Sequence, residues 1–399
     1  MDGAPLAIDV AAERGPLVAI ASMFGTRSIA AAYDRKSNSF TPVRLVLALL
    51  VLYSHAFALA GQGPGEDQLK AITNGQATFG FVAVLSFFAI SGFLVTQSAE
   101  GIRGRWWMFD FLARRGLRIM PALVVMALIM VAVVGPLSTK YSMAAYLWTP
   151  SYWNPRDWFV DTVTFQAFGW HVRVRDVFAD TPVGAAMNGS LWSLRYEVAA
   201  YLALVVGAVV VRRRLGLIAT PLALLFGALV VARFFGLPTT PIHGPWVLSQ
   251  YDDLIFCGSA FFSGSVLYLV RDRVPAAPAW IAAAGVVMVA GMVAGPTRIS
   301  LLLLPYVVIA LAISPRLAAY ERRVGDYSYA TYLYAWPVEQ SIVHLAGPMD
   351  PYRLALFAAL ITVALAIVSW HLIEAPAINL KRVLARTRPL AEAPATANG

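Results

Sequence analysis

An arginine and a histidine lie within one apolar stretch near the start of the chain, FTPVRLVLALLVLYSHAFALAG (residues 40–61). Arg44 and His55 are 11 residues apart, about three turns of an α-helix, so both side chains would share one face about 16 Å apart along the axis. A guanidinium binds phosphate through paired hydrogen bonds, and an imidazole is the commonest general base. Because a charged side chain costs about 2.5–3.5 kcal/mol in hydrocarbon, the pair is a candidate for chemistry.

The composition indicates where such a stretch would lie. The 399 residues are 59% hydrophobic and only 13% charged, and the mean hydropathy is +0.66, whereas soluble domains are about 25% charged. The sequence therefore predicts an all-α integral membrane protein. The single cysteine, Cys257, excludes an internal disulfide, and no spacing of His and Cys predicts a metal site or a tightly bound cofactor.

Hydropathy predicts about ten transmembrane helices. They span residues 42–60, 77–98, 117–137, 190–211, 215–235, 252–270, 277–294, 299–314, 327–346 and 352–374. Around this transmembrane domain, residues 40–380, we expect a flexible cytoplasmic segment at 1–39 and a disordered cytoplasmic tail at 381–399. With both termini cytoplasmic, 21 of the 31 Lys and Arg residues fall on the cytoplasmic side and eight on the other, which agrees with the positive-inside rule.

This orientation gives each polar residue of the spans a depth. An inner group consists of Arg44, Ser91, Arg114, Arg115, Arg118 and Glu374. An outer group consists of His55, Trp192, Ser193 and Glu197. The inner arginines favour a polyphosphate ligand, and the outer group favours general base catalysis by His55 with a carboxylate orienting its ring. The alternatives are structural: positive-inside anchors for the arginines and a polar bridge between helices for His55.

One predicted external connection, residues 138–189, is long and rich in aromatic side chains. It contains Trp148, Trp153, Trp158 and Trp170 among mixed charges. Such side chains suit either an aromatic belt at the membrane surface or a platform for a sugar or a lipid head group. Loops of this length are often functional.

Six sequence blocks resemble, in the same order, those of the acyltransferase type 3 family of bacterial integral membrane O-acyltransferases. They are Arg-x10-His at Arg44 and His55, FFAISGFLVT at 87–96, RRGLRIMP at 114–121, SLWSLRYEVAAYL at 190–202, GDYSYATYLYAWPVEQ at 325–340 and LIEAP at 372–376. One position departs from many members of the family. Ala335 stands where they have a histidine before the proline, as in a subgroup of the family, and this excludes a second catalytic histidine there.

The resemblance implies a cytoplasmic acyl-CoA donor, usually acetyl-CoA, and a glycan or glycolipid acceptor, such as lipopolysaccharide or exopolysaccharide, outside a bacterial inner membrane. We accordingly expect His55, Arg44 and Glu197 to be catalytic, with Glu197 orienting His55 or binding the sugar, and with either direct transfer or a covalent acyl-histidine. The expected acyl-CoA contacts are Arg44, Arg114, Arg115, Arg118 and Ser91, and the expected supporting residues are Trp192, Ser193, Tyr332 and Glu374.

Two other functions fit the same residues. Polar residues within spans also mark the substrate and proton paths of transporters and flippases, but the sequence shows no clear internal repeat of the kind that transporters often carry. A membrane scaffold without chemistry would lose nothing when His55 is replaced by alanine, whereas an acyltransferase would lose its activity.

Overall fold

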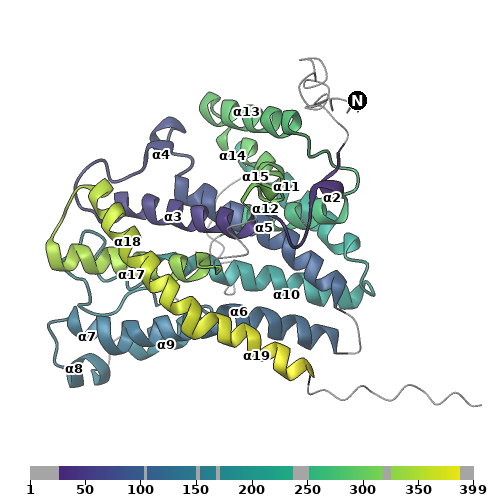
Figure 1. The fold of residues 1–399 in the computed structure, drawn as a ribbon. Helices are drawn as coiled ribbons and strands as arrows, with labels where there is room; N and C mark the ends of the chain where they lie inside the picture. Colours follow the sequence, from purple (N-terminus) through teal and green to yellow (C-terminus); the bar gives the residue numbers. More distant parts are fainter. Residues whose placement is uncertain are drawn as a thin grey trace, which may run out of the picture.

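In a computed structural model, the described part of the chain folds into helices joined by turns and loops (Figure 1). The structure describes residues 27–102, 106–149, 153–167, 171–236, 251–317 and 325–386. These residues form helices, turns and isolated bridges but no strand, so the predicted all-α class is confirmed for the described part of the chain. Residues 1–26 of the predicted N-terminal segment, residues 387–399 of the predicted tail and Trp170 lie outside it.

Every predicted span corresponds to a helix or to helices joined end to end. The helices are α3 (Phe40–Leu59), α5 (Phe79–Gly101), α6 (Trp107–Ile129) with η1 (Met130–Val134) and α7 (Gly135–Leu137), η2 (Gly189–Ser193) with α10 (Leu194–Val210), α11 (Gly216–Phe234), α12 (Tyr251–Leu269), α13 (Pro278–Ala294), α14 (Thr297–Ser300) with η3 (Leu301–Leu303) and α15 (Leu304–Ala312), α17 (Ser328–Ala346), and α18 (Pro351–Ser369) with η5 (Trp370–Glu374) and α19 (Ala375–Arg386). Among the described residues, six segments are long and apolar enough to cross a membrane: α3, α5, α6 to α7, η2 with α10, α11, and α18 with part of α19. The structure thus supports a membrane protein, while the count of ten spans and the cytoplasmic termini stay predictions.

Helices α5 and α17 are largely enclosed by other helices. α5 packs against α3 and α12, and α17 packs against α3 and α18 (Figure 1). Where α5 crosses α12 the backbones touch, because a Cβ added to Gly92 would lie 1.9 Å from the Phe261 carbonyl oxygen. Small residues permit such a close approach of membrane helices. This packing turns the polar side chains of α3 and α17 toward one another inside the bundle.

Three boundaries differ from the prediction. The third span begins at Trp107 rather than at 117, because the arginines of this helix find partners inside the bundle. Residues 27–39, expected to be flexible, pack against the bundle: Ile29 is fully buried, and its N–H donates to the Val274 carbonyl at 2.8 Å. α19 continues to Arg386, so the first residues of the expected tail are helical.

The described residues of the long connection at 138–189 include two helices. They are α8 (Met143–Trp148) and α9 (Pro155–Val163), and α9 packs against α6. Trp158 is buried in the core, whereas Trp148 and Trp153 are 66% and 42% exposed. Trp158 therefore serves packing, and of the described tryptophans in this connection only Trp148 and Trp153 are placed for the predicted belt or platform.

Candidate functional site

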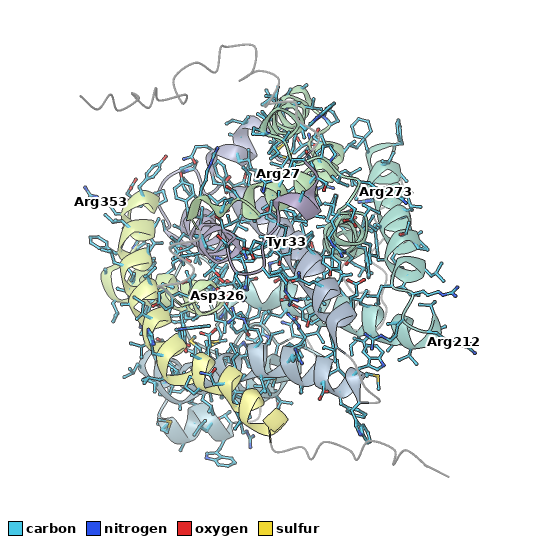
Figure 2. The ribbon with its side chains drawn as sticks, turned by 45° about the vertical axis from the view of Figure 1, so that its right-hand side comes forward. Arg27, Tyr33, Arg212, Arg273, Asp326 and Arg353 are labelled. Atoms are coloured by element: carbon cyan, nitrogen blue, oxygen red, sulfur yellow. The ribbon has the colours of Figure 1, made fainter. Side chains whose placement is uncertain are left out.

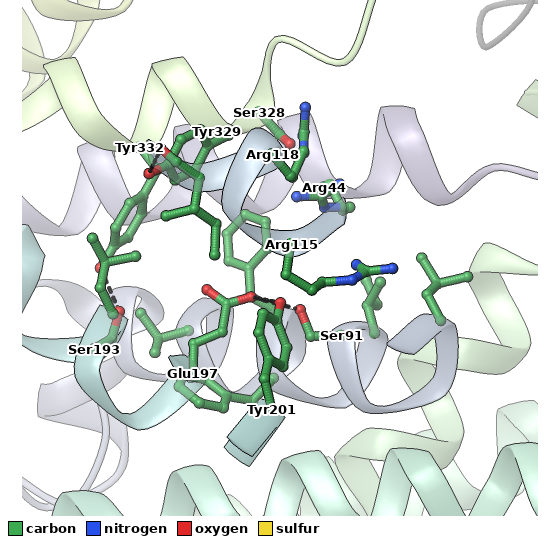
Figure 3. A pocket seen from close by; sticks show the side chains of 17 residues that line it. Arg44, Ser91, Arg115, Arg118, Ser193, Glu197, Tyr201, Ser328, Tyr329 and Tyr332 are labelled. Carbon is green, nitrogen blue, oxygen red and sulfur yellow. Dashed lines mark hydrogen bonds between the residues drawn. The ribbon is translucent and has the colours of Figure 1, made fainter. Parts of the chain in front are cut away.

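A cavity lined by arginines lies between α3, α5, α6, α10 and α17. Its polar lining consists of Arg44, Ser91, Arg115, Arg118, Ser193, Glu197, Tyr201, Ser328, Tyr329 and Tyr332 (Figure 3). We call it the arginine cavity. In Figure 3 the arginines lie toward one end of the cavity, and Tyr332 and Ser193 lie at the other. Five segments that are far apart in the sequence thus supply one site.

An aspartate just before α17 holds two of these arginines. Arg44 and Arg118 each place a guanidinium nitrogen 2.6 Å from Asp326 Oδ2, and Arg118 also lies 3.4 Å from Glu374 Oε2. Burial alone would raise the pKa of Asp326, but Arg118 and Arg44 outweigh it and hold that pKa below its usual value. Asp326 is a site residue that the sequence interpretation missed, although it stands in the quoted block that begins at Gly325.

The other two predicted arginines have different surroundings. Arg115 lines the cavity with its guanidinium 5.8 Å from the ring centres of Phe111 and Tyr201, and it has no carboxylate within ion-pair distance among the described residues. Arg114 does not line the cavity. Adjacent helical residues point about 100° apart, so Arg114 and Arg115 cannot both face it. The predicted role of Arg114 in acyl-CoA binding therefore has no support from this geometry.

Glu197 belongs to the arginine cavity and not to the surroundings of His55, which corrects the predicted grouping. Its Oε1 accepts hydrogen bonds from Ser91 Oγ (3.0 Å) and from the Tyr201 hydroxyl. Glu197 comes one helical turn after Ser193, which places it about 6 Å farther along the axis. Ser193 lines the same cavity as Glu197, so both leave the predicted outer group, whereas Trp192 stays beside His55.

A second cavity contains the predicted catalytic histidine. It is lined by Val51, Ser54, His55, Thr78, Gly80, Phe81, Val84, Trp192 and Tyr332, and we call it the histidine cavity. The imidazole of His55 contacts the Trp336 indole edge to face, with 5.0 Å between ring centres. Its Nδ1 is buried and faces Glu339, 3.9 Å from Oε2. The carboxylate beside His55 is therefore Glu339 of α17 rather than Glu197.

Glu339 is the second site residue that the sequence interpretation missed. Its side chain is fully buried, and neither carboxylate oxygen has a hydrogen-bond partner among the described residues. A buried polar group without a partner is costly and needs an explanation. The signal was present in the sequence, because an acid in the middle of a predicted span is itself a functional candidate.

The two cavities adjoin each other at Tyr332. Tyr332 lines both of them, and its hydroxyl accepts from Ser193 Oγ (2.8 Å) while donating to the Ser190 carbonyl. Trp192 lines the histidine cavity and Ser193 lines the arginine cavity. Three of the predicted supporting residues therefore lie together at the boundary between the cavities: Trp192, Ser193 and Tyr332. The fourth, Glu374, forms an ion pair with Arg118.

The chain matches known proteins along most of its length. A family model described as an acyltransferase domain matches residues 39–372. An O-acetyl transferase of Shigella phage Sf6 is 28% identical over 374 residues, which cover 89% of this chain and 98% of that protein. Nodulation protein 10 of Rhizobium leguminosarum bv. viciae is 29% identical over 396 residues, which cover 88% of this chain and 96% of that protein. No solved structure matches the chain.

Proposed function

Because the chain belongs to this acyltransferase family, we propose that it is a membrane O-acetyltransferase. It would move an acetyl group from cytoplasmic acetyl-CoA to a hydroxyl of a cell-surface or secreted glycan on the far side of a bacterial inner membrane. The phage relative is named as an O-acetyl transferase, which supports acetyl as the transferred group. The similarity to the nodulation protein shows that related chains also occur in a bacterium.

The observation that carries this proposal is that two cavities with different linings adjoin each other. An arginine-lined cavity and a histidine-lined cavity adjoin one another inside one helical bundle, with Tyr332 common to both. An enzyme whose donor and acceptor lie on opposite sides of a membrane needs one binding site for each, and a reacting group where the sites meet. A general base must come within about 3 Å of the oxygen that carries the proton it removes, and His55 lines the cavity in which the acceptor would lie.

The arginine cavity would bind the donor. Arg44 and Arg118 keep N–H groups beyond those engaged by Asp326, and Arg115 contributes a charge without an ion-paired carboxylate among the described residues. Guanidinium groups bind phosphate oxygens in pairs. Glu197 and Ser91 lie in the same cavity, and Glu197, as an acceptor of hydrogen bonds, would suit the amide N–H groups of the pantetheine arm.

The histidine cavity would hold the acceptor and the base. In direct transfer the glycan hydroxyl oxygen attacks the thioester carbonyl carbon, a C–O bond forms and the C–S bond breaks. His55 Nε2 takes the hydroxyl proton and returns it to the CoA sulfur. For this, Nδ1 must carry a proton, and Glu339 is placed to accept a hydrogen bond from that N–H group. The 3.9 Å separation would close by less than about 1 Å in the substrate complex, since catalytic hydrogen bonds are often long without substrate.

The test uses membranes of the source organism in which its own copy is replaced by wild type or by His55→Ala. Radiolabelled acetyl-CoA is added, and label is followed into extracted polysaccharide and glycolipid. We expect label with wild type and a loss of about 10²–10⁴-fold with His55→Ala, at equal amounts of protein in the membrane. Full activity of His55→Ala would refute the catalytic assignment. An absence of label with wild type would favour a transporter, to be tested next by glycan export.

A further inference from the structure

The boundary between the two cavities consists of side chains. Of the described residues that line the cavities, Val84 of α5 and Tyr332 of α17 are the two that line both. Both are nearly buried, with exposed fractions of 4% and 7%. They come from the two enclosed helices of the bundle. Whatever moves from one cavity to the other must therefore pass these two side chains.

Hydrogen bonds and ring packing hold Tyr332 in place at the boundary. The Tyr332 hydroxyl is fixed by Ser193 and by the Ser190 carbonyl, both in η2, and its ring packs edge to face on Phe87 with 6.2 Å between ring centres. Val84 is β-branched, and such a side chain has one strongly preferred rotamer in a helix. The size of the opening is consequently set by the side-chain volumes at these two positions.

Resting on the proposed acyl transfer, the geometry points to Val84 and Tyr332 as the residues that select the acyl group by its length. The phosphates of the donor would lie with the arginines on one side of the boundary, and His55 lines the cavity on the other. The acyl group has to reach His55 in direct transfer and in a covalent relay alike. Acetyl brings one methyl group past the boundary, and each further methylene must find space against Val84 and Tyr332.

The magnitude of this selection follows from the behaviour of apolar pockets. One methylene in a tightly packed pocket discriminates between substrates by about 10–200-fold. Val84→Ala removes two methyl groups from the boundary and leaves the helix former alanine in α5. We expect it to raise the ratio of butyryl to acetyl transfer by about tenfold or more. Val84→Leu adds volume at the same place and should lower that ratio below the wild-type value.

A matched control lies on the same helix. Val95 is fully buried in α5 and lines neither cavity, so Val95→Ala makes the same deletion in the same element away from the boundary. It should leave the ratio at the wild-type value, whatever it does to stability. A folding defect in any variant lowers transfer from all donors alike, and the ratio is insensitive to it.

The experiment uses membranes of the source organism that carry wild type, Val84→Ala, Val84→Leu or Val95→Ala, supplied separately with radiolabelled acetyl-, propionyl- and butyryl-CoA. Opposite shifts of the ratio in the two Val84 variants, with no shift in Val95→Ala, would establish the selection. Wild-type acetyl transfer combined with equal ratios in all four proteins would overturn it and leave the proposed function intact. If wild type transfers none of the three groups, the proposed function fails, and this inference fails with it.

Discussion

At the scale of single residues, Glu339 is the buried group that most needs a function. It is a carboxylate without a hydrogen-bond partner among the described residues, 3.9 Å from His55 Nδ1. Such a group lowers the stability of the fold, because burying a charged or polar group without a partner costs free energy, so its presence indicates a function. Orienting the His55 ring and stabilising its imidazolium form would be such a function.

Glu339→Gln tests this role, because it keeps the shape of the side chain and removes its ability to ionise. We expect kcat for acetyl transfer to fall on the order of 10²-fold, with an unchanged KM for acetyl-CoA, since the donor site lies in the other cavity. Thermal stability in detergent should stay equal or increase. A purely structural Glu339 would give the reverse, with reduced stability and a nearly normal kcat. Glu66→Gln, at an exposed acid, is the matched control.

The pairing of Asp326 with Arg44 and Arg118 leads to a dependence of stability on pH. The pKa of Asp326 is below its usual value in the folded protein, so its ionised form stabilises the fold at any pH above the unfolded value of about 3.9. That contribution is lost as the pH falls through the lower, folded pKa. We expect Asp326→Asn to cost on the order of 3 kcal/mol of unfolding free energy at neutral pH. The cost should shrink below about pH 4.

Thermal melts of wild type and Asp326→Asn from neutral to acidic pH would measure this difference. Asp272→Asn, at an exposed acid in the connection between α12 and α13, should match wild type at every pH. A difference for Asp326→Asn that stays constant down to the lowest pH would show that the ion pairs contribute nothing to it.

At the scale of helices, the close crossing of α5 and α12 depends on two glycines. A Cβ on Gly92 would lie 1.9 Å from the Phe261 carbonyl oxygen, and one on Gly264 would lie 2.1 Å from that of Ala89. Real Cβ atoms do not approach backbone this closely, so the helices would have to separate. Since α5 supplies Val84, Ser91 and Phe87 to the arginine cavity, the separation would also disturb the site.

We therefore expect Gly92→Ala to lower the yield of monodisperse protein and to lower its thermal midpoint, with a cost of about 1–3 kcal/mol or more from overpacking. Gly101→Ala is the control on the same helix, because its Cβ would meet nothing within 4 Å. That variant should equal or exceed wild type, since alanine favours the helix. Equal behaviour of the two variants, measured by size exclusion and melting, would contradict the close crossing.

Helices were the part of the structure that the sequence predicted best, and contacts across the bundle were the part it could not. Long apolar runs identify α3 or α5 because hydropathy is a local property. The pairing of His55 with Glu339 joins residues 284 positions apart. Depth from the sequence has a precision of about one helical turn, and it does not say which neighbouring helix a side chain faces. Grouping by depth therefore put the wrong carboxylate beside His55.

At the scale of the whole molecule, enclosure explains why α17 is less apolar than a typical membrane span although its 19 residues are long enough to cross. α17 carries Glu339 and Gln340, both fully buried, and it is surrounded by α3, α18 and α6. A helix enclosed by protein does not need a lipid-compatible surface, and polar residues inside a membrane bundle face its interior. Only helices in contact with lipid must be apolar around their outer face. The finding of six segments that are long and apolar enough to cross a membrane, among the described residues, is thus compatible with a larger number of spans.

The predicted topology places Arg353 on the opposite side of the membrane from Arg212 and Arg273. Arg353 lies on the side of the molecule away from Arg273 and Arg212 (Figure 2). Three predicted spans, 277–294, 299–314 and 327–346, lie between residues 273 and 353. An odd number of crossings requires opposite sides of the membrane.

Cysteine labelling in intact cells would decide the orientation, and the chain is suited to it because its single cysteine, Cys257, is buried. We expect a membrane-impermeant maleimide to label Arg353→Cys in intact cells, and Asp272→Cys only after the cells are broken. Neither change removes a positive charge from the predicted cytoplasmic side, so the positive-inside signal is preserved. Labelling of both in intact cells would break the odd count of crossings. The inverse pattern would place the arginine cavity toward the outside, where acyl-CoA is absent, and the proposed direction of transfer would fail with it.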